Sequence, residues 1–284
     1  MRTQAHGIAL MACLVGCVGD APTTPLADAS PVVDTGVAVD SGNDVSVIPD
    51  ASADVGDAAG PWTPKKLPAL ALWLDGSVGV TAAVGNKVSK WADQSGNGND
   101  ATQQSATLQP ILAPGAINNR DGLYFDKTGS PVALNIASPN QASMAGDFTV
   151  MVVFKSALLS STAGDLFRAE ASSTTDALLQ VAPPDLIASV AVSGSGKAAF
   201  APQAIFGDGK PHFVGMRRSA AKLEVLADGA SASVVSPPAG DVGGKFIIGG
   251  QIKGPIAEVV LSTGTVDDTA LGLLNAYLKK KYAL

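Results

Sequence analysis

The sequence is poor in glutamate, aromatic residues and cysteine. Its 284 residues include three glutamates, two cysteines and 5% aromatic residues. Glutamate is a strong helix former, so its scarcity, together with 31 glycines and 18 prolines, disfavours a helical bundle. A chain that is disordered throughout is excluded because 46% of the residues are apolar and only 15% are charged. We therefore expect one large all-β domain with appended segments.

The first sixteen residues have the pattern of an export signal. One positive side chain, Arg2, precedes an apolar run over residues 8–15. This run is too short to cross a bilayer, which requires about 20 apolar residues. We interpret residues 1–16 as a cleavable signal peptide.

The stretch Leu14-Val15-Gly16-Cys17 resembles the lipobox of bacterial lipoproteins, in which a peptidase cuts before a diacylated cysteine. The resemblance implies that Cys17 is lipidated, becomes the first residue of the mature protein and holds it on a membrane. Val18 follows the cysteine, and the absence of aspartate there implies the outer membrane or cell surface of a diderm bacterium. The alternative is an ordinary signal peptide that contains two cysteines.

Lipidation would also settle the chemistry of the two cysteines. Cleavage removes Cys13, and acylation occupies Cys17, so the mature chain would have no free thiol. Neither a disulfide framework nor a thiolate metal site is then expected, and packing must supply the stability.

Residues 17–64 differ sharply in composition from the rest of the chain. They contain eight aspartates, no lysine or arginine, and no aromatic residue before Trp62. A segment with so few large apolar groups cannot offset its ordering entropy, and its like charges repel, so we predict a disordered acidic tether. Residues 65–284 carry 18 basic and 17 acidic side chains. This near-neutral balance without a basic stripe disfavours nucleic acid as a partner.

Residues 65–284 are rich in strand patterns. In the segment 147–154, alternate positions are apolar on both faces, which is typical of a central strand covered on both sides. The glycine-containing pairs at 97–98, 121–122, 208–209, 228–229 and 243–244 are expected to supply turns with positive φ. The predicted strands are 70–75, 147–154, 212–216, 222–226, 245–248 and 256–261. Together they indicate a two-sheet antiparallel fold.

The end of the chain has a helical pattern. Asp267 can cap a helix, and Val266 before it can pack on Leu271. Lysines 279–281 suit the negative end of the helix. The apolar residues that share one face are Leu271, Leu274, Leu278 and Tyr282. We expect a helix that closes the sandwich and not a membrane-surface helix, because the basic residues cluster at one end.

Six motifs in order resemble those of LamG-like jelly-roll domains in the concanavalin A-like lectin/glucanase superfamily. They are LALWLDG at 70–76, VSKWADQSGNGND at 88–100, GLYFD at 122–126, DFTV at 147–150, DGKPHFV at 208–214 with LADG at 226–229, and IAEVV at 256–260 with LKKKY at 278–282. The resemblance implies a jelly-roll sandwich over residues 65–284. It does not settle the activity, because the superfamily contains lectins, adhesion modules and hydrolases.

The sequence offers no set of residues for hydrolysis. Glucanases of that superfamily place carboxylates at alternate positions of one strand, and no such alternation occurs here. Glu170, Glu224 and Glu258 are therefore interpreted as single surface or rim carboxylates, and His212 as a hydrogen-bonded sheet residue. The G-x-S-x-G motif is also absent. We predict no catalytic residues and no enzymatic activity.

One loop partly imitates a calcium site. Asp93, Asn97 and Asn99 are the candidate ligands, with Gly98 at the sixth place of the loop. The twelfth place holds Gln104, where a calcium loop needs a bidentate glutamate. The alternative is a tight Asn-Gly hairpin turn without metal.

The residues that would bind a ligand are not identified by the sequence. Trp73, Trp91 and Tyr124 lie in apolar strand motifs and are expected to pack in the core, whereas a sugar-binding aromatic is exposed. The anchor, tether and resemblance together predict a lipid-anchored envelope or cell-surface recognition module that binds a glycan or a glycoprotein. The alternatives are a structural or adhesive protein-binding module and a divergent glycoside hydrolase.

Overall fold

The computed structural model describes residues 61–126, 131–141, 143–155, 164–182, 185–202 and 208–284. The predicted signal peptide 1–16, the predicted lipidation residue Cys17 and the predicted tether up to residue 60 lie outside these ranges. In the ranges that are described, no helix is long and apolar enough to span a bilayer.

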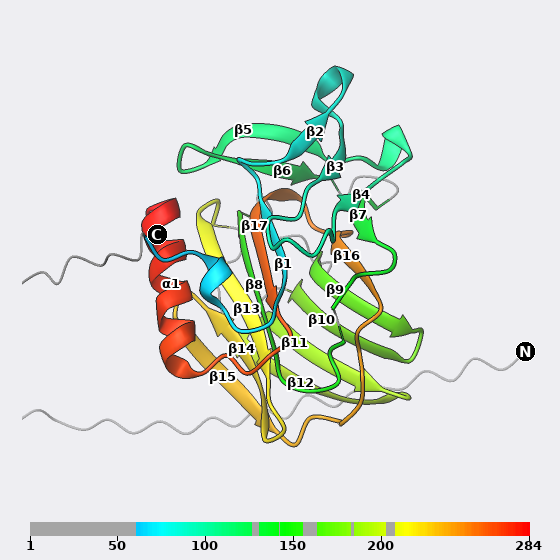
Figure 1. Ribbon diagram of the computed structural model, residues 1–284, viewed down its shortest axis with the longest axis vertical. Helices are drawn as coiled ribbons and strands as arrows, with labels where there is room; N and C mark the ends of the chain where they lie inside the picture. The colour runs from blue at the N-terminus through cyan, green and yellow to red at the C-terminus, as the bar shows by residue number, and fades with distance from the viewer. Residues whose placement is uncertain (1–60, 127–130, 142, 156–163, 183–184, 203–207) are drawn as a thin grey trace, which may run out of the picture. The chain divides into compact units, whose positions relative to one another are not determined.

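Two antiparallel sheets face each other (Figure 1). Sheet A contains β1 (Leu70–Asp75), β5 (Ile111–Ile117), β6 (Arg120–Phe125), β8 (Phe148–Lys155), β13 (Pro211–Arg218), β14 (Lys222–Ala227), β15 (Ala230–Val235) and β17 (Gly254–Ser262). Sheet B contains β2 (Val80–Ala82), β3 (Val88–Trp91), β4 (Ala101–Thr102), β7 (Ala133–Ile136), β9 (Gly164–Ser172), β10 (Thr175–Ala182), β11 (Asp185–Val192), β12 (Ser195–Pro202) and β16 (Lys245–Gly249). The prediction of a two-sheet antiparallel sandwich is confirmed.

Short 3-10 helices lie in the connections, and one α-helix ends the chain. The short helices are η1 (Pro64–Lys66), η2 (Val84–Asn86) and η3 (Ala106–Leu108), and the α-helix is α1 (Asp268–Tyr282). In sheet A the strand order is β15-β14-β13-β8-β17-β6-β5, with β1 also paired to β17. In sheet B it is β12-β11-β10-β9-β16-β7-β4-β3-β2.

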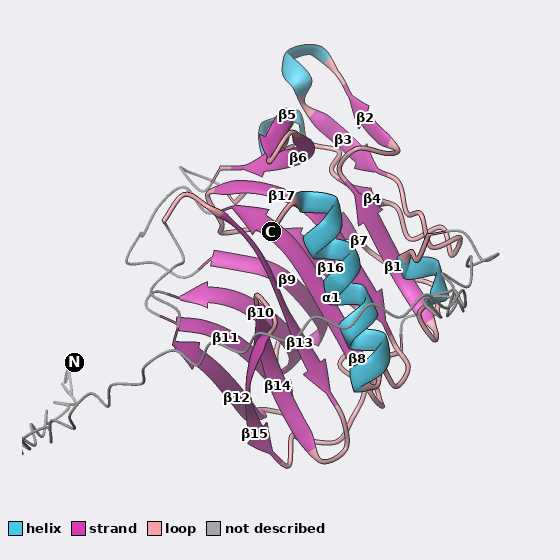
Figure 2. Ribbon diagram, turned by 90° about the vertical axis from the view of Figure 1, so that its left-hand side faces the viewer, coloured by secondary structure: helices cyan, strands magenta, loops and turns pink. Residues whose placement is uncertain are grey.

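The central strand β8 is buried on both faces, as its apolar pattern predicts. Phe148, Val150 and Val152 point into the core between the sheets. Met151 and Val153 point the other way, into a second apolar cluster under helix α1. The fold therefore has three layers, which are α1, sheet A and sheet B (Figures 1 and 2).

Helix α1 begins and packs as the sequence predicts. The backbone N–H of Ala270 donates to Asp267 Oδ1 at 2.7 Å, which caps the first turn. The four residues of the predicted apolar face are buried, namely Leu271, Leu274, Leu278 and Tyr282. Burial of each such side chain contributes about 1.5–3 kcal/mol. This packing holds α1 on the outer face of sheet A.

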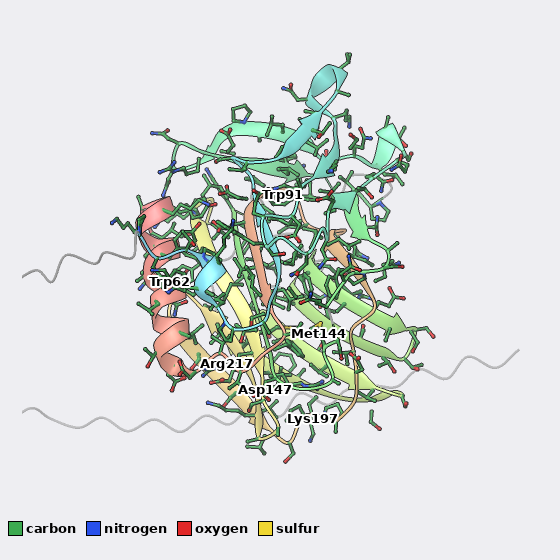
Figure 3. All side chains as sticks on the ribbon, in the orientation of Figure 1. Trp62, Trp91, Met144, Asp147, Lys197 and Arg217 are labelled. Carbon is green, nitrogen blue, oxygen red and sulfur yellow. The ribbon has the colours of Figure 1, made fainter. Side chains whose placement is uncertain are left out.

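The packed region begins before the predicted boundary at residue 65. Trp62 lies beside helix α1, with its ring centroid 5.8 Å from that of Tyr277 (Figure 3). Pro64 is buried as well. The end of the predicted tether therefore contributes to the second apolar cluster.

Two of the predicted turns are wrong. Asp121-Gly122 lies inside β6, and the turn before this strand is made by Asn118 and Asn119, whose φ angles are 46° and 65°. Gly122 is needed because a Cβ there would approach the Ile256 carbonyl oxygen to 3.1 Å. Gly243-Gly244 has no positive φ, and Gly244 instead lies against the backbone of β9. The pair at 228–229 is confirmed, with φ angles of 51° and 94°.

Candidate ligand-binding face of sheet B

Among the described residues, the outer face of sheet B is a broad surface without a covering helix. Helix α1 covers the outer face of sheet A, and no described helix covers that of sheet B (Figure 2). One register row crosses six neighbouring strands of sheet B, from β4 to β11, and presents half-buried side chains to solvent. They are Thr102, Asn135, Ile247, Arg168, Leu178 and Ser189.

Arg168 occupies the middle of this row. Its Nη2 lies 3.2 Å from Asp165 Oδ2, and its Nη1 lies 3.8 Å from Asp176 Oδ2. Gln180 Nε2 donates to the other oxygen of Asp165 at 2.9 Å. The Nε of Arg168 is buried and has no hydrogen-bond partner among the described residues. The neighbouring side chains thus fix the guanidinium and leave a donor atom unused.

A second row carries more charge. Glu170 is the register partner of both Asp176 and Lys245, and its carboxylate lies 3.8 Å from Lys245 Nζ. Burial raises the pKa of Asp176 from its ordinary value, the charge of Arg168 opposes this, and the charges of Glu170 and Asp165 reinforce it. Each of the two register-paired carboxylates, Glu170 and Asp176, lies near a cation.

A hollow of about 330 Å³ opens beside Arg168. Its polar lining includes Gln103, Asn135, Asp165 and Gln251, and Ile247 supplies an apolar wall. Amide, carboxylate and guanidinium groups can each make two hydrogen bonds, and the apolar wall can receive C–H groups. We call this hollow with Arg168 the Arg168 hollow. It suits a ligand that carries several hydroxyl groups on an apolar ring.

Phe200 supplies an exposed aromatic ring on the same face. Its side chain is 51% exposed, and a register row links it through Ile187 and Gln180 to Asp165. Phe200 was not predicted from the sequence because it lies outside the six motifs that carry the family resemblance. The signal that could have found it is the alternation over 198–201, where Ala199 and Ala201 are buried.

The three aromatic residues that the sequence places in the core differ in their burial. Trp91 is fully buried, as predicted, and its Nε1 donates to the Asp75 carbonyl oxygen at 2.8 Å. Trp73 is half-buried and packs against the second apolar cluster, in line with the prediction. Tyr124 is half-buried and belongs to neither apolar cluster, so the prediction that it is a core residue is wrong. Tyr124 lines a separate hollow with Lys87.

Glu258 is wholly buried, so its interpretation as a surface or rim carboxylate is wrong. It accepts hydrogen bonds from Trp73 Nε1 at 2.7 Å, Tyr277 Oη at 3.0 Å and Lys281 Nζ at 2.8 Å. Lys281 also donates to Asp75 at 2.6 Å. Burial raises the pKa of Glu258, and the charge of Lys281 opposes this. Enclosed by these partners, the carboxylate serves to attach helix α1 to sheet A and has no open side for a substrate.

The other two glutamates differ from each other. Glu224 is also buried, contrary to the surface interpretation, and accepts from Arg217 Nε at 2.6 Å and from Lys222 Nζ at 2.8 Å. Glu170 is half-exposed on sheet B, as a rim carboxylate would be.

His212 is the hydrogen-bonded sheet residue that the sequence predicts. Its Nδ1 lies 2.8 Å from Asp228 and its Nε2 lies 3.2 Å from Asp208. Burial opposes protonation, but the hydrogen bonds and charges of Asp228 and Asp208 outweigh it and raise the pKa of the imidazole.

The candidate calcium residues lie in one loop between β3 and β4. The Asp93 carboxylate accepts from the backbone N–H groups of Trp73, Ser95 and Asn99 and from the Ser95 hydroxyl, at 2.6–3.0 Å. The amide of Asn97 donates to the Leu70 carbonyl oxygen at 2.7 Å. In the described part of the chain, no three His, Cys, Asp or Glu side chains are grouped to hold a metal. Calcium binding through Asp93, Asn97 and Asn99 stays a prediction.

No family model and no curated protein matches this sequence. Solved structures match it at the level of the fold. The binding domain of botulinum neurotoxin DC in complex with SialylT matches with a TM-score of 0.58 at 10% identity, over 76% of this chain and 52% of that chain. The serotype C1 binding domain matches with a TM-score of 0.58 at 10% identity, over 76% and 53%.

A Trypanosoma rangeli sialidase in complex with a difluorinated 2-keto-3-deoxy-nononic acid matches with a TM-score of 0.54 at 16% identity. The match covers 75% of this chain and 33% of the sialidase. This chain thus spans about half the length of the neurotoxin structures and a third of the sialidase. The similarity shows that the β-sandwich is shared, and at these identities it shows the fold alone.

Proposed function

We propose that the protein is a lipid-anchored recognition module on the envelope or cell surface, whose β-sandwich binds a glycan. We also propose that the sandwich is a LamG-like domain of the concanavalin A-like superfamily. Cys17 would carry the lipid, and residues 17–64 would hold the domain away from the membrane.

The observation that carries the glycan proposal is the open face of sheet B. Arg168, Asp165 and Gln180 form a connected set of donors and acceptors beside the Arg168 hollow. Phe200 adds an exposed ring on the same face. Planar polar groups next to an apolar or aromatic platform are the chemistry that a pyranose ring requires.

The similar structures support the same class of ligand. The neurotoxin binding domain was solved in complex with SialylT, and the sialidase with a sugar acid derivative. Another structure of this group concerns interaction with two ganglioside molecules. They also favour a binding module over a glycoside hydrolase, because most of these similar structures are binding domains.

A glycan array with the non-acylated mature chain tests the proposal, with calcium and with chelator. Removal of Arg168 and Gln180 together, as Arg168→Ala/Gln180→Ala, should reduce binding at least tenfold, since charged hydrogen bonds contribute about 1.5–3 kcal/mol and 1.4 kcal/mol is tenfold. Lys280→Ala, on the exposed side of α1, is the matched control and should bind normally. An array without any bound glycan would remove the carbohydrate part of the proposal.

Lipid anchoring has its own test. Cys17→Ser should yield soluble, unacylated protein, because the acyl chains would be the only strong membrane attachment. Unchanged partition into membranes for this variant would contradict the anchor.

A protein-binding module is the second candidate, and the edges of the sandwich favour it. Strands β12 and β15 end their sheets, and Val235 on β15 is 69% exposed. An open edge can pair with a strand of another protein. A specific envelope protein recovered by pull-down, insensitive to competing sugars, would favour this function over glycan binding.

A further inference from the structure

Strand β15 is the last strand of sheet A, and in the described part of the chain no strand pairs with its free side (Figure 2). Its six residues are Ala-Ser-Ala-Ser-Val-Val, none of them charged and none of them proline. Its pairing with β14 is regular, without a bulge. Charges, prolines, bulges and very short strands are the devices that keep a sheet edge from pairing with another chain. Strand β15 has none of them within its own length.

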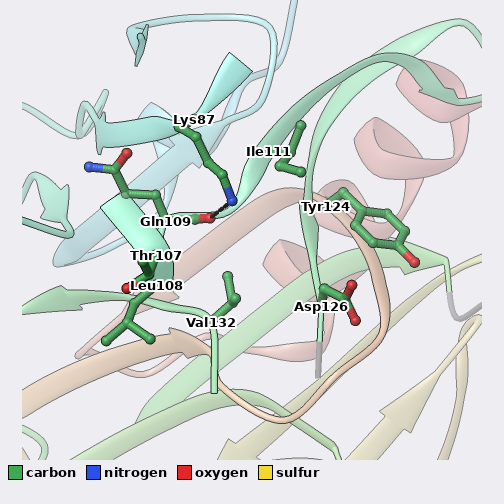
Figure 4. A pocket seen from close by; sticks show the side chains of 8 residues that line it. All are labelled: Lys87, Thr107, Leu108, Gln109, Ile111, Tyr124, Asp126 and Val132. Carbon is green, nitrogen blue, oxygen red and sulfur yellow. Dashed lines mark hydrogen bonds between the residues drawn. The ribbon is translucent and has the colours of Figure 1, made fainter. Parts of the chain in front are cut away.

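The other edge strands among the described residues do have such devices. Strand β2 is only three residues long. Strand β5 contains Pro114, and Ile111 at its start forms a bridge with Lys87 (Figure 4). Strand β12 carries Lys197 on the same face as the buried Ala199, and an inward-pointing charge discourages pairing.

The free side of β1 is covered by the loop between β3 and β4. The backbone N–H of Trp73 donates to Asp93 at 3.0 Å, and the backbone N–H of Gln94 donates to the Trp73 carbonyl oxygen at 2.7 Å. The Asn97 amide donates to the Leu70 carbonyl oxygen, also at 2.7 Å. The loop thus replaces a neighbouring strand. Among the described edges, β15 is the one without protection.

The ladder between β14 and β15 shows which backbone groups of β15 are free. The backbone N–H of Ser236 donates to the Ala221 carbonyl oxygen at 2.9 Å, just beyond the end of the strand. Hydrogen-bonded pairs recur at every second position of an antiparallel ladder, so the even-numbered residues of β15 bond to β14. The N–H and C=O groups that point away from β14 belong to the odd-numbered residues, which are Ser231, Ser233 and Val235.

These three residues allow β15 to pair with a copy of itself. Consider two antiparallel β15 strands related by a two-fold axis at Ser233. Ser233 then faces Ser233 of the second copy, and Ser231 faces Val235 of the second copy. All three residues exchange hydrogen bonds with the residue that they face. No charged residue faces another between the two strands, so no like charges repel.

The side chain of Val235 favours a second copy as the occupant of this edge. It is apolar and 69% exposed. Ser231 and Val235 share the face of Leu226, which packs under α1. A hollow of about 370 Å³ opens on this face, and its lining includes Ser231, Leu226 and Leu271. In the two-fold pair, Val235 of each copy lies beside Ser231 of the other, at the rim of this hollow. Each copy thus covers the exposed valine of the other.

We propose that the protein self-associates through β15, which pairs antiparallel with β15 of a second copy and joins the two copies of sheet A into one continuous sheet. This inference goes beyond glycan binding and does not depend on it. Two six-residue strands bury less surface than a stable interface, which needs about 1,200 Å² in total. The association is therefore weak and reversible, and a covalent trap is the suitable test.

Single cysteines report the register of the pair. The test uses the mature chain with Cys17→Ser, which leaves no cysteine after residue 16. Facing Cα atoms in a hydrogen-bonded antiparallel pair are about 5.5 Å apart, which a disulfide can span. With diamide as the oxidant, Ser233→Cys should form a disulfide-linked dimer.

Two further cysteine variants are the controls for register. In Ser231→Cys alone, the two thiols would be four residues apart along the strands, or about 14 Å, so its cross-linking should be at least tenfold slower than that of Ser233→Cys. The same holds for Val235→Cys alone. An equimolar mixture of Ser231→Cys and Val235→Cys should cross-link rapidly again, because these two positions face each other.

A charge on the edge gives an independent measure. Val235→Lys, added to Ser233→Cys, should slow cross-linking at least tenfold, because a lysine on an edge strand opposes pairing. Val84→Lys is the matched control, since Val84 is 97% exposed on η2, and it should leave the rate unchanged. Both valines are exposed, so the melting curves of the two variants should match that of their parent.

The possible outcomes separate this inference from the proposed function. Equal cross-linking rates for Ser233→Cys and Ser231→Cys, or a rate that Val235→Lys leaves unchanged, overturn self-association through β15. An envelope protein that is lost on Val235→Lys, without self-cross-linking of Ser233→Cys, assigns the edge to a foreign strand and also overturns it. None of these results affects glycan binding on sheet B, and a glycan array without any bound glycan leaves the self-association intact.

Discussion

Lys281, in the last turn of α1, forms a 2.8 Å ion pair with Glu258, which is wholly buried in the middle of β17. Asp75, the register partner of Glu258 on β1, lies 2.6 Å from the same ammonium. One lysine therefore compensates two carboxylates and attaches the final helix to sheet A.

Replacement of Lys281 should strongly destabilise the fold. In Lys281→Met, Glu258 and Asp75 lose their common counter-charge in a buried setting. Breaking a buried pair in this way costs about 3–5 kcal/mol. Urea unfolding measures the loss, and Lys280→Met, at an exposed position, should remain within about 0.5 kcal/mol of the wild type. Equal stability of the two variants would show that the buried pair does not hold the helix.

The stability of the fold should depend on pH through His212. Its pKa is raised above the ordinary 6.5 in the folded state. Protonated His212 therefore stabilises the folded state. This stabilisation is fully present below pH 6.5 and is lost as the pH rises through the folded-state pKa. We expect the difference in unfolding free energy between the wild type and His212→Gln to shrink from pH 6 toward alkaline pH.

The same histidine can be observed directly. The sequence contains two histidines, and cleavage of the predicted signal would remove His6, so a single imidazole remains for NMR titration. A folded-state pKa at or below 6.5 would contradict the expected sign.

The loop around Asp93 should be sensitive to mutation even in the absence of calcium. Asp93→Ala removes an acceptor of four hydrogen bonds, three of them from backbone N–H groups. We expect a loss of about 2–3 kcal/mol, because hydrogen bonds to a charged group contribute about 1.5–3 kcal/mol and the orphaned donors partly regain water. Melting with calcium and with chelator measures this. A calcium-dependent rise in melting temperature that Asp93→Asn abolishes would establish the metal site.

Phe200 should contribute to binding and not to stability. Its ring is half-exposed on sheet B, so Phe200→Ala should change the melting temperature little. Loss of a stacking ring should weaken glycan binding about three- to tenfold, in line with about 0.5–1.5 kcal/mol for such a contact. Val235→Ala, at an exposed position on the edge of sheet A, is the control. Equal glycan affinity of the two variants would exclude Phe200 from the site.

Several elements of the fold follow from local sequence patterns. The apolar positions of β8 identify a strand covered on both faces, and Asp267 with the buried positions of α1 identifies the closing helix. These predictions succeed because alternation and helical periodicity record which sides of an element are buried.

Of the strands that carry the candidate site, β16 was predicted from the sequence, but β9 to β12 were not. Strands β9 to β12 place apolar residues inward, many of them alanine, and polar ones such as Asp165 and Gln180 outward. Their apolar signal is weak because alanine fills many inward positions, among them Ala169, Ala177 and Ala188. Arg168 could not be placed beside Asp165 and Asp176 before the pairing of β9 with β10 was known.

The sequence by itself determined the class of this domain, because strand and helix periodicities, turn glycines and the helix cap are local properties of the chain. Only the tertiary structure decided which charged residues are buried and which surface is open. Glu258 has ordinary neighbours in its own strand, and it becomes a buried ion only because α1 returns over sheet A with Lys281. In the same way, only the packed structure shows that α1 covers sheet A and that no described helix packs on the outer face of sheet B. Burial of a charge depends on partners that are distant in sequence, and no local pattern contains that information.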